Sequence, residues 1–306
     1  MKKYLLTLVI LTISLKIFGQ QDPHYSFFMY NQVSYNPAYS GTEGMVNVVG
    51  INRNQWMGLD GAPQTSVMSA DMPINIGSIQ SGIGVTILND KIGFENNFSA
   101  KLAYAYHIKV GTGLLSIGVD GGMFNKAIEG DWQFPDEAES IFSGKCRKMA
   151  FDMSGGLYYN VGELTLGLSS THLLEPKLDY DKDGKTFLAR HYYFTSSYNI
   201  PLANSLFDLT PGIILMSDGK SLQADINISC LYNKKIFGGV TYRNEDALSV
   251  LAGFSIMNDF KVGVAYEFGI SKLRKTNAGS FEVMLGYSFM LEHGKPAQKV
   301  RSVRFL

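Results

Sequence analysis

Two groups of residues have the side-chain types that could do chemistry: an acidic run and the histidines. Residues 179–184 read Asp-Tyr-Asp-Lys-Asp-Gly, the pattern that begins a calcium-binding EF-hand loop. The twelfth position of such a loop should be a bidentate Glu, but here it is Arg190. A solvated acidic loop is therefore the simpler interpretation, with a weak ion site as the alternative. The histidines lack metal-ligand spacing, so we predict no metal site; they are His24, His107, His172, His191 and His293.

Motifs for catalysis or cofactor binding are missing from the sequence. It has neither a Gly-x-Ser-x-Gly nucleophile elbow nor a complete Gly-x-x-x-x-Gly-Lys-Ser/Thr phosphate loop. Acidic and hydroxyl side chains are plentiful, but the lumens of barrels are normally lined with them. The 27 basic and 27 acidic residues give a formal net charge of zero, which argues against a nucleic-acid partner. We therefore predict no enzyme activity, no catalytic residue and no cofactor, with a barrel lipase or protease as the disfavoured alternative.

The first twenty residues form an export signal. Lys2 and Lys3 make a basic region, residues 4–13 an apolar run, and residues 14–19 a cleavage zone. The apolar run is too short to span a bilayer, so we predict a signal peptide over residues 1–20 that is then removed. No later stretch of about 18 apolar residues follows, and we expect no membrane-spanning helix.

The rest of the chain alternates between apolar and polar side chains with a period of two. Within residues 221–232, for example, Ile226 and Ile228 share one register, and Asp225 and Asn227 the other. Successive side chains of a strand point to opposite faces, so each such segment has one apolar and one polar face. Charged residues make up 18% of the chain, below the roughly 25% of soluble domains. For an exported chain this favours a transmembrane antiparallel β-barrel with a polar lumen, although a soluble β-sandwich would show the same period.

Fourteen strands can be placed, an even number, as single-chain bacterial barrels usually require. Cys146 falls in a predicted loop and Cys230 in a predicted strand; two cysteines are too few for a disulfide framework, so we expect both to be unpaired. Pro211 lies inside a predicted strand, where it should mark a bulge or kink because it has no N–H to donate. The predicted strands span residues 46–53, 64–74, 81–89, 97–109, 113–124, 149–160, 163–171, 190–200, 205–216, 221–231, 235–243, 247–257, 259–270 and 279–290.

The connections between these strands sort by length. Those after even strands are short, whereas the two longest, residues 125–148 and 172–189, follow odd strands. Outer-membrane barrels have short periplasmic turns and longer outward loops, so we expect both chain ends on the periplasmic side. Residues 46–290 would form the barrel, and the basic residues 291–306 a periplasmic tail. Residues 21–45, rich in aromatic residues and Asn, would sit at the periplasmic rim or fold into the lumen as a small plug.

Five short motifs follow one another along the chain. Residues 22–41 begin with Asp-Pro and contain Asn-Pro-Ala-Tyr, and residues 53–63 begin with Arg-Asn-Gln-Trp and end with Gly-Ala-Pro. Residues 89–93 read Asn-Asp-Lys-Ile-Gly, residues 242–247 contain Tyr-Arg and Asp-Ala, and residues 279–282 read Gly-Ser-Phe-Glu. In this ordered set the chain resembles the PorP/SprF family of outer-membrane proteins of the type IX secretion system. Family members often carry His where Phe281 stands, so no role is assigned to that position.

The resemblance implies an outer-membrane barrel that takes part in exporting proteins with a C-terminal type IX sorting domain. It covers essentially the whole chain after the signal peptide. Some family members look like general components of the machinery, and others are linked to one surface protein, such as a gliding-motility adhesin. The implied partners are an exported protein with a sorting domain, other type IX secretion components and the lipid of the outer membrane. The family supplies no catalytic residues.

Several motif residues fall at connections after odd strands, and we expect them to bind the sorting domain at the outer mouth. The alternative is that Trp56, Pro63 and the nearby glycines only shape a tight loop folded into the lumen. The partner-binding candidates are Arg53, Gln55, Trp56, Gly58, Pro63, Asn89, Asp90, Tyr242, Arg243 and Asp246. The candidates in the periplasmic or plug segment, expected to contact the machinery beneath, are Asp22, Pro23, Tyr25, Asn31, Asn36, Pro37 and Tyr39.

Two other classes of protein stay open at this point. A diffusion porin of the outer membrane would use residues 125–148 as an inward constriction loop, but the aromatic N-terminal segment argues for a nearly closed lumen. A periplasmic β-sandwich would share the alternation, but it would have no reason to sort its loops by length.

Overall fold

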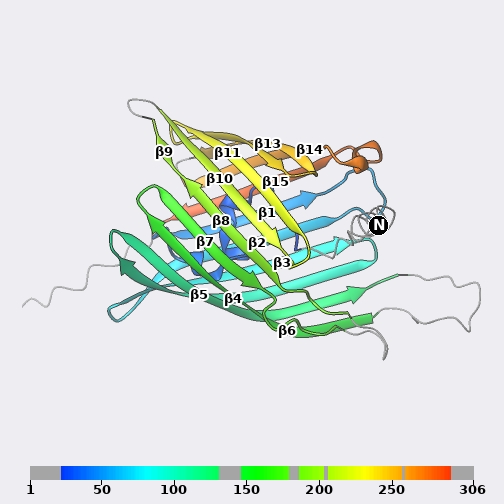
Figure 1. Cartoon of the computed structure of the whole chain (residues 1–306), viewed down its shortest axis with the longest axis horizontal. Coiled ribbons are helices and arrows are strands. Elements are labelled where there is room, and N and C mark those ends of the chain that lie inside the picture. Colours follow the sequence, from blue (N-terminus) through cyan, green and yellow to red (C-terminus); the bar gives the residue numbers. More distant parts are fainter. Residues whose placement is uncertain (1–21, 131–145, 179–185, 203–205, 257–258, 291–306) are drawn as a thin grey trace, which may run out of the picture.

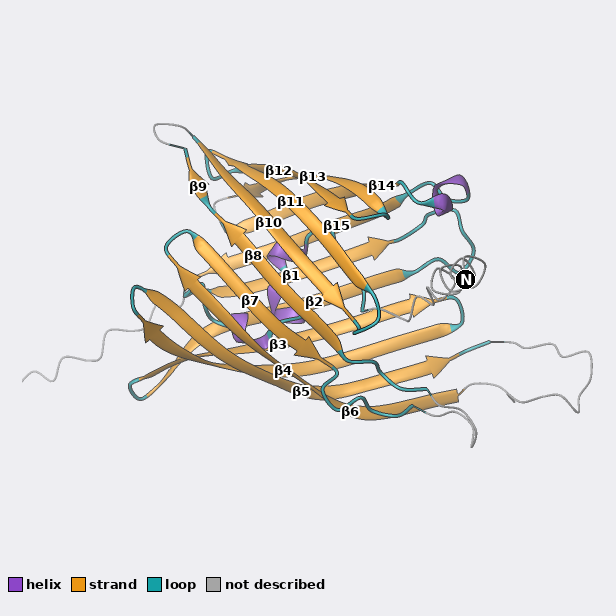
Figure 2. Cartoon of the chain, viewed as in Figure 1, coloured by secondary structure: helices purple, strands orange, loops and turns teal. Residues whose placement is uncertain are grey.

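The chain folds into a closed, antiparallel β-barrel. The computed structural model describes residues 22–130, 146–178, 186–202, 206–256 and 259–290, and within them each strand pairs with its neighbours in one continuous sheet (Figure 1, Figure 2). Pairing of β10 with β11 and of β1 with β15 closes the ring. The predicted signal peptide, the acidic run 179–184 and the basic tail lie outside the described residues.

The strands agree with the predicted set to within a few residues at most ends. They are β1 (Val46–Asn54), β2 (Gln64–Ile76), β3 (Ile79–Ile92), β4 (Glu95–Val110), β5 (Gly113–Ile128), β6 (Cys146–Val161), β7 (Leu164–Thr171), β8 (His191–Tyr198), β9 (Ile200–Pro201), β10 (Phe207–Ser217), β11 (Leu222–Tyr232), β12 (Ile236–Arg243), β13 (Ala247–Ile256), β14 (Phe260–Gly269) and β15 (Ser280–Phe289).

The two-residue strand β9 is a continuation of β8, so the barrel has fourteen strands, as predicted. Both segments pair with β10 in one register, and the gap between them lies beside Pro211. Because Pro211 has no N–H to donate, the hydrogen-bond ladder with β10 is interrupted there. On its other side Pro211 stays opposite Ile228 in an unbroken ladder with β11. The predicted bulge is therefore wrong, because the register does not shift.

The strands between β3 and β6 are longer than predicted. β5 continues to Ile128 and β6 begins at Cys146, so the loop expected over residues 125–148 is shorter and Cys146 lies on a strand. β3 runs on to Ile92, which places residues 89–92 on a strand rather than in a connection. These polar ends look like loops in the sequence, but their backbones still pair with the neighbouring strands. Cys146 and Cys230 are both free.

The two ends of the barrel differ in the length of their connections. We call the end that carries residues 55–63, 129–130, 172–178, 186–190 and 270–279 the long-loop rim; it lies on the right in Figure 1. The opposite end, the short-turn rim, carries the tight turns 77–78, 111–112 and 162–163 and the start of β1. Within the described residues, no helix has the length and hydropathy needed to cross a membrane.

The apolar register of the strands faces outward and the polar register faces the lumen. On β11, Asp225 and Asn227 are buried, whereas Ile226 and Ile228 are more than half exposed. On β4, Leu102 is 71% exposed, although it lies in the middle of the strand. Exposed apolar side chains of this kind, repeated around a closed ring with no free edge, form a surface suited to lipid.

The N-terminal segment lies inside this ring. We call residues 22–44 the plug; they contain three short 3-10 helices, η1 (Phe28–Tyr30), η2 (Gln32–Ser34) and η3 (Pro37–Tyr39), seen inside the barrel in Figure 2. Phe27 is fully buried in an apolar cluster with wall residues such as Leu251 and Met284. The ring of Tyr39 meets Tyr158 edge-on, with centroids 5.3 Å apart.

Glycines on the inner wall allow the plug backbone to approach closely. A Cβ atom on Gly82 would lie 1.9 Å from the carbonyl oxygen of Ser40, and one on Gly118 would lie 2.3 Å from the backbone nitrogen of Ala38. No side chain fits at either position without moving the plug. The wall is therefore shaped to receive the 3-10 helix η3.

Replacing Gly118 by Ala tests this fit. The added methyl group must displace η3 or the wall, and overpacking of this kind costs about 1–3 kcal/mol. We expect the G118A variant to convert from its folded to its unfolded gel band at a lower temperature than wild type. The control is Gly50→Ala, because a Cβ there meets nothing within 4 Å. Equal transition temperatures for the two variants would contradict a tightly seated plug.

Candidate functional site: the plug and its two ion clusters

The plug crosses the lumen from one end towards the other. Asp22 accepts hydrogen bonds from Thr171 and Tyr193, at the long-loop ends of β7 and β8. At the other end of the plug, the backbone N–H of Gly41 donates to Asp71 of β2 at 2.8 Å. The segment therefore lies in the lumen, and its first described residue faces the long-loop rim.

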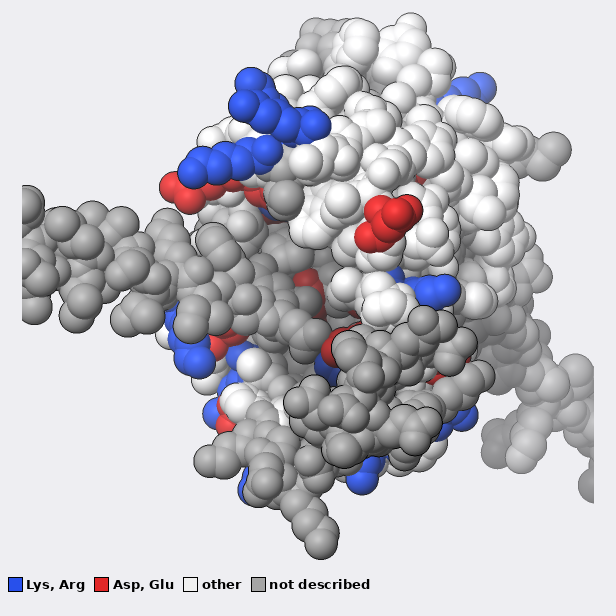
Figure 3. Space-filling model, turned by 90° about the vertical axis from the view of Figure 1, so that its right-hand side faces the viewer, with Lys and Arg blue, Asp and Glu red and all other residues white. Residues whose placement is uncertain are grey.

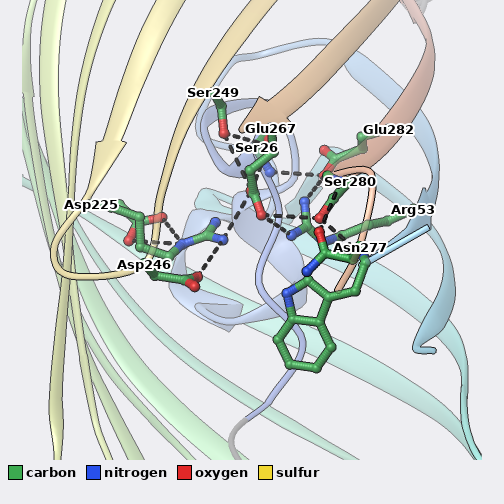
Figure 4. Close-up of polar contacts among 12 residues, drawn as sticks. Ser26, Arg53, Asp225, Asp246, Ser249, Glu267, Asn277, Ser280 and Glu282 are labelled. Atoms are coloured by element: carbon green, nitrogen blue, oxygen red, sulfur yellow. Dashed lines mark hydrogen bonds and ion pairs between the residues drawn. The ribbon is translucent and has the colours of Figure 1, made fainter. Parts of the chain in front are cut away.

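On one wall, a buried cluster of two arginines and three carboxylates lies close to the long-loop rim. We call it the arginine cluster: Arg53, Asp225, Arg243, Glu267 and Glu282, each at most 4% exposed as a side chain (Figure 4). Glu267 joins the arginines, since it lies 2.8 Å from Arg53 and 3.0 Å from Arg243. Arg53 also reaches Glu282 at 3.2 Å, and Arg243 reaches Asp225 at 2.9 Å. Asp246, 30% exposed, completes the arrangement at 3.5 Å from Arg243.

The arginine cluster holds the plug through its backbone. The N–H groups of Ser26 and Phe27 both donate to the carboxylate of Glu282, each at 2.9 Å. With Asp246 included, four carboxylates face two guanidinium groups, so acceptor oxygens outnumber the arginine donors and these N–H groups supply two further donors to Glu282. An ionised acceptor makes such hydrogen bonds stronger than neutral ones. The plug is therefore part of the charge balance of the wall.

A second cluster lies on the opposite wall, and we call it the histidine cluster: Asp22, Lys101, Asp152, His172 and His191. Lys101 on β4 lies 3.0 Å from Asp152 on β6. The imidazole of His172 sits between two carboxylates, with Nδ1 2.7 Å from Asp152 and Nε2 2.9 Å from Asp22. This cluster therefore holds the first described residue of the plug.

The burial and charges of the lumen shift the pKa values of plug and loop residues. Burial alone would lower the pKa of His172, but Asp22 and Asp152 outweigh it and raise the pKa to about 9. Burial would raise the pKa of Asp22, yet His172 and hydrogen bonds hold that pKa well below its ordinary value. For His24, burial together with Arg243 and Arg53 lowers the pKa to about 3. His24 is therefore neutral at physiological pH.

The structure does not bring the predicted partner-binding residues together on one surface. Arg53, Asp90 and Arg243 point inward and are buried, and Asp90 accepts a hydrogen bond from Thr65 at 2.6 Å. Tyr242 is 43% exposed and lies on the outward register of β12. Asn89 is likewise exposed, one residue before the inward Asp90. Of the candidates, Arg53 and Arg243 are linked through Glu267 in the arginine cluster, and Asp246 lies at its edge beside Arg243.

The loop over residues 55–63 carries the other candidates: Gln55, Trp56, Gly58 and Pro63. Backbone hydrogen bonds tie it to its neighbours, from Met57 to Gly279 on one side and from Gly93 to Gly61 on the other. Trp56 has a positive φ of 51°, a left-handed conformation that few bulky residues adopt. The loop is therefore a fixed part of the long-loop rim.

The centre of the long-loop rim contains charged side chains of both signs. Figure 3 views this rim and shows acidic and basic side chains inside the central hollow. Deeper in the barrel, a cavity of about 140 Å³ lies between the plug and the wall, lined by polar residues that include Asn31, Asp71 and Lys261. The plug thus shares this part of the lumen with a small polar cavity.

A closed ring of fourteen strands with an apolar exterior and a plugged polar lumen defines the class: an integral outer-membrane β-barrel protein. The family model "Type IX secretion system membrane protein PorP/SprF" matches residues 17–287. The chain belongs to this family, as its ordered motifs predicted. No curated protein sequence matches the chain.

The comparison with solved structures found distant matches, each with a TM-score under 0.5. Omp33 of Acinetobacter baumannii is 7% identical, with 81% of this chain and 98% of that chain covered and a TM-score of 0.47. The Ralstonia pickettii toluene transporter TbuX is 12% identical, with 84% and 92% covered and a TM-score of 0.49. A mutant of the Rh. blastica porin is 9% identical, with 80% and 99% covered and a TM-score of 0.36.

Sequence reasoning missed several residues of the two clusters. Glu267, Asp152 and His172 were not candidates, because no motif contains them. Two of the ion pairs follow from cross-strand register, in which Arg53 lies opposite Glu282 and Asp225 lies opposite Arg243. Opposite charges at facing, inward positions predict an ion pair. This signal can be read from the sequence only when the register of the two strands is known.

Replacing Glu267 by Gln tests whether the arginine cluster stabilises the barrel. The change keeps the shape but leaves two buried guanidinium groups without their shared carboxylate, and breaking a buried pair costs about 3–5 kcal/mol. We expect a clearly lower unfolding temperature of the detergent-solubilised protein. The control is Glu175→Gln, since Glu175 pairs with Arg190 at 3.6 Å on the surface and should contribute at most about 1 kcal/mol. Equal losses in both variants would contradict the central role of Glu267.

Proposed function

We propose that this protein is an outer-membrane component of the type IX secretion system that supports export or surface attachment of proteins with a C-terminal sorting domain. A gliding-motility adhesin is one substrate of this kind. Membership of the PorP/SprF family carries the proposal. The protein acts by binding other proteins rather than by catalysis, and its further partners are other components of the secretion machinery.

The filled lumen favours this role over the runner-up, a diffusion porin. A porin needs a continuous aqueous path, whereas here aromatic side chains of the plug, such as Phe27 and Tyr35, are buried against the wall. Protein backbone also approaches the wall closely at Gly82 and Gly118. The cavity found between the plug and the wall, of about 140 Å³, is small beside a channel. A wild-type barrel in a planar bilayer should therefore conduct little.

The proposed orientation places the long-loop rim outside the cell and the short-turn rim in the periplasm, as is usual for bacterial barrels. In this orientation Gln55, Trp56 and Gly58 lie at the outer mouth, where they would contact the sorting domain. The inward Arg53 and Arg243 support the rim from beneath. The plug is buried in the lumen, so the basic residues 291–306 would serve as the periplasmic contact with the machinery.

Deleting the gene tests the proposed function. We expect the surface and secreted proteome of the deletion strain to lose proteins that carry a type IX sorting domain, measured by quantitative mass spectrometry against wild type. Loss of one or a few such proteins would identify a dedicated partner, and broad loss a general component. An unchanged set of sorting-domain proteins would contradict the proposal and favour the porin.

Replacing Trp56 by Ala tests the outer mouth as the binding surface. Truncating a central aromatic side chain in a protein interface commonly costs about 2 kcal/mol or more, which corresponds to a roughly 30-fold loss of affinity. We expect the W56A variant to assemble normally but to retain less substrate at the cell surface. The control is Tyr198→Ala, an exposed aromatic residue near the short-turn rim. Unchanged retention of the substrate by an assembled W56A barrel would contradict a role of Trp56 in binding. Trp56 would then only shape the loop.

A further inference from the structure

Three residues that are far apart in the sequence place metal-ligating atoms together in the histidine cluster. One carboxylate oxygen of Asp22 and one ring nitrogen each of His172 and His191 lie within 4.8 Å of one another. The closest pair, His172 Nε2 and Asp22 Oδ1, is 2.9 Å apart. Their sequence spacing gives no hint of this grouping, because the plug brings Asp22 to the end of β7 from inside the barrel.

Each of the three side chains is held by an outer partner. Nδ1 of His172 lies 2.7 Å from the carboxylate of Asp152, and Nδ1 of His191 donates to the carbonyl oxygen of Ala189 at 2.9 Å. Thr171 and Tyr193 donate to Oδ2 of Asp22 at 2.9 and 2.7 Å, so Oδ1 is the oxygen directed to the histidines. Metal-binding histidines are almost always fixed in this way, by a carboxylate or a backbone carbonyl on the second nitrogen.

One ligand atom of this group has no partner of its own. His191 is 4% exposed, and among the described residues its Nε2 has no hydrogen-bond partner. Because Nδ1 carries the proton donated to Ala189, Nε2 of the neutral ring bears a lone pair. A buried acceptor left unsatisfied is costly, and a bound cation would satisfy it.

We propose that Asp22, His172 and His191 form a binding site for a divalent transition metal of the zinc type. Two imidazole nitrogens and one carboxylate oxygen are a ligand set that zinc accepts, with a fourth position left for water. Ligand atoms on a tetrahedral zinc ion lie about 3.3 Å apart, which small shifts of the present positions achieve. Asp22 is 27% exposed, so the site is open to solvent on one side.

The metal would fasten the start of the plug to the barrel wall. Asp22 belongs to the plug, whereas His172 follows β7 and His191 begins β8. Binding displaces the proton shared by His172 Nε2 and Asp22 Oδ1, which is released to the solvent. Asp152 and Lys101 then remain as the outer partners that orient His172.

Zinc binding to the full-length, detergent-solubilised protein tests the site. After treatment with a chelator and its removal, titration with zinc chloride in a calorimeter should show one strong site per chain. The H191N variant should bind zinc more than about 100-fold more weakly, because it loses a direct ligand, while its amide keeps a donor for Ala189. Zinc should also raise the unfolding temperature of wild type and not that of H191N.

The matched control is His107→Asn, which replaces another buried histidine, one whose Nδ1 contacts Ser116 rather than the proposed site. This variant should bind zinc as wild type does. A further measurement uses only the wild-type protein, so it does not depend on whether a variant folds. Cobalt(II) bound to wild type should give the visible absorption bands of a tetrahedral site with nitrogen and oxygen ligands. Absence of a stoichiometric site in wild type, or equal zinc affinity in wild type and a folded H191N variant, would overturn the proposal.

Discussion

The central physical constraint is the burial of charge inside the barrel. Glu267 lies between Arg53 and Arg243 in a region almost closed to solvent, where an unpaired charge would be costly. Removing any one partner leaves another uncompensated. The Glu282 carboxylate of the arginine cluster also accepts hydrogen bonds from two N–H groups of the plug. The strands that close the barrel and the segment that fills it are thus coupled through one electrostatic arrangement.

In the histidine cluster at the opposite wall, buried charges are likewise paired with one another. Asp152 is fully buried, and Lys101 and His172 both contact it. His172 in turn reaches Asp22. The plug is therefore held by charged groups near its beginning and by apolar packing and close glycine contacts further along. A segment fixed at both walls is suited to closing a lumen, which fits a protein that binds other proteins at its ends better than one that passes solutes.

The sequence predicted the fold well because a membrane barrel imposes a strict period of two on every strand. Ile226 and Ile228 face outward and Asp225 and Asn227 inward, as the alternation indicated. It predicted the candidate site less well. Whether Arg53 points into a wall cluster or onto a rim depends on strand length and register, and the meeting of Asp22 with His172 and His191 depends on the path of the plug. Neither leaves a local pattern in the sequence.

Hydrogen exchange tests most directly whether the plug is held in the lumen. Backbone amides of residues 22–44 would be followed by mass spectrometry of the detergent-solubilised protein and compared with those of β14 and β15. Because the N–H groups of Ser26, Phe27 and Gly41 donate to buried wall carboxylates, we expect their exchange to be as slow as that of the strands. Exchange as fast as in the exposed turn at residues 77–78 would contradict a held plug and show that the segment leaves the lumen freely.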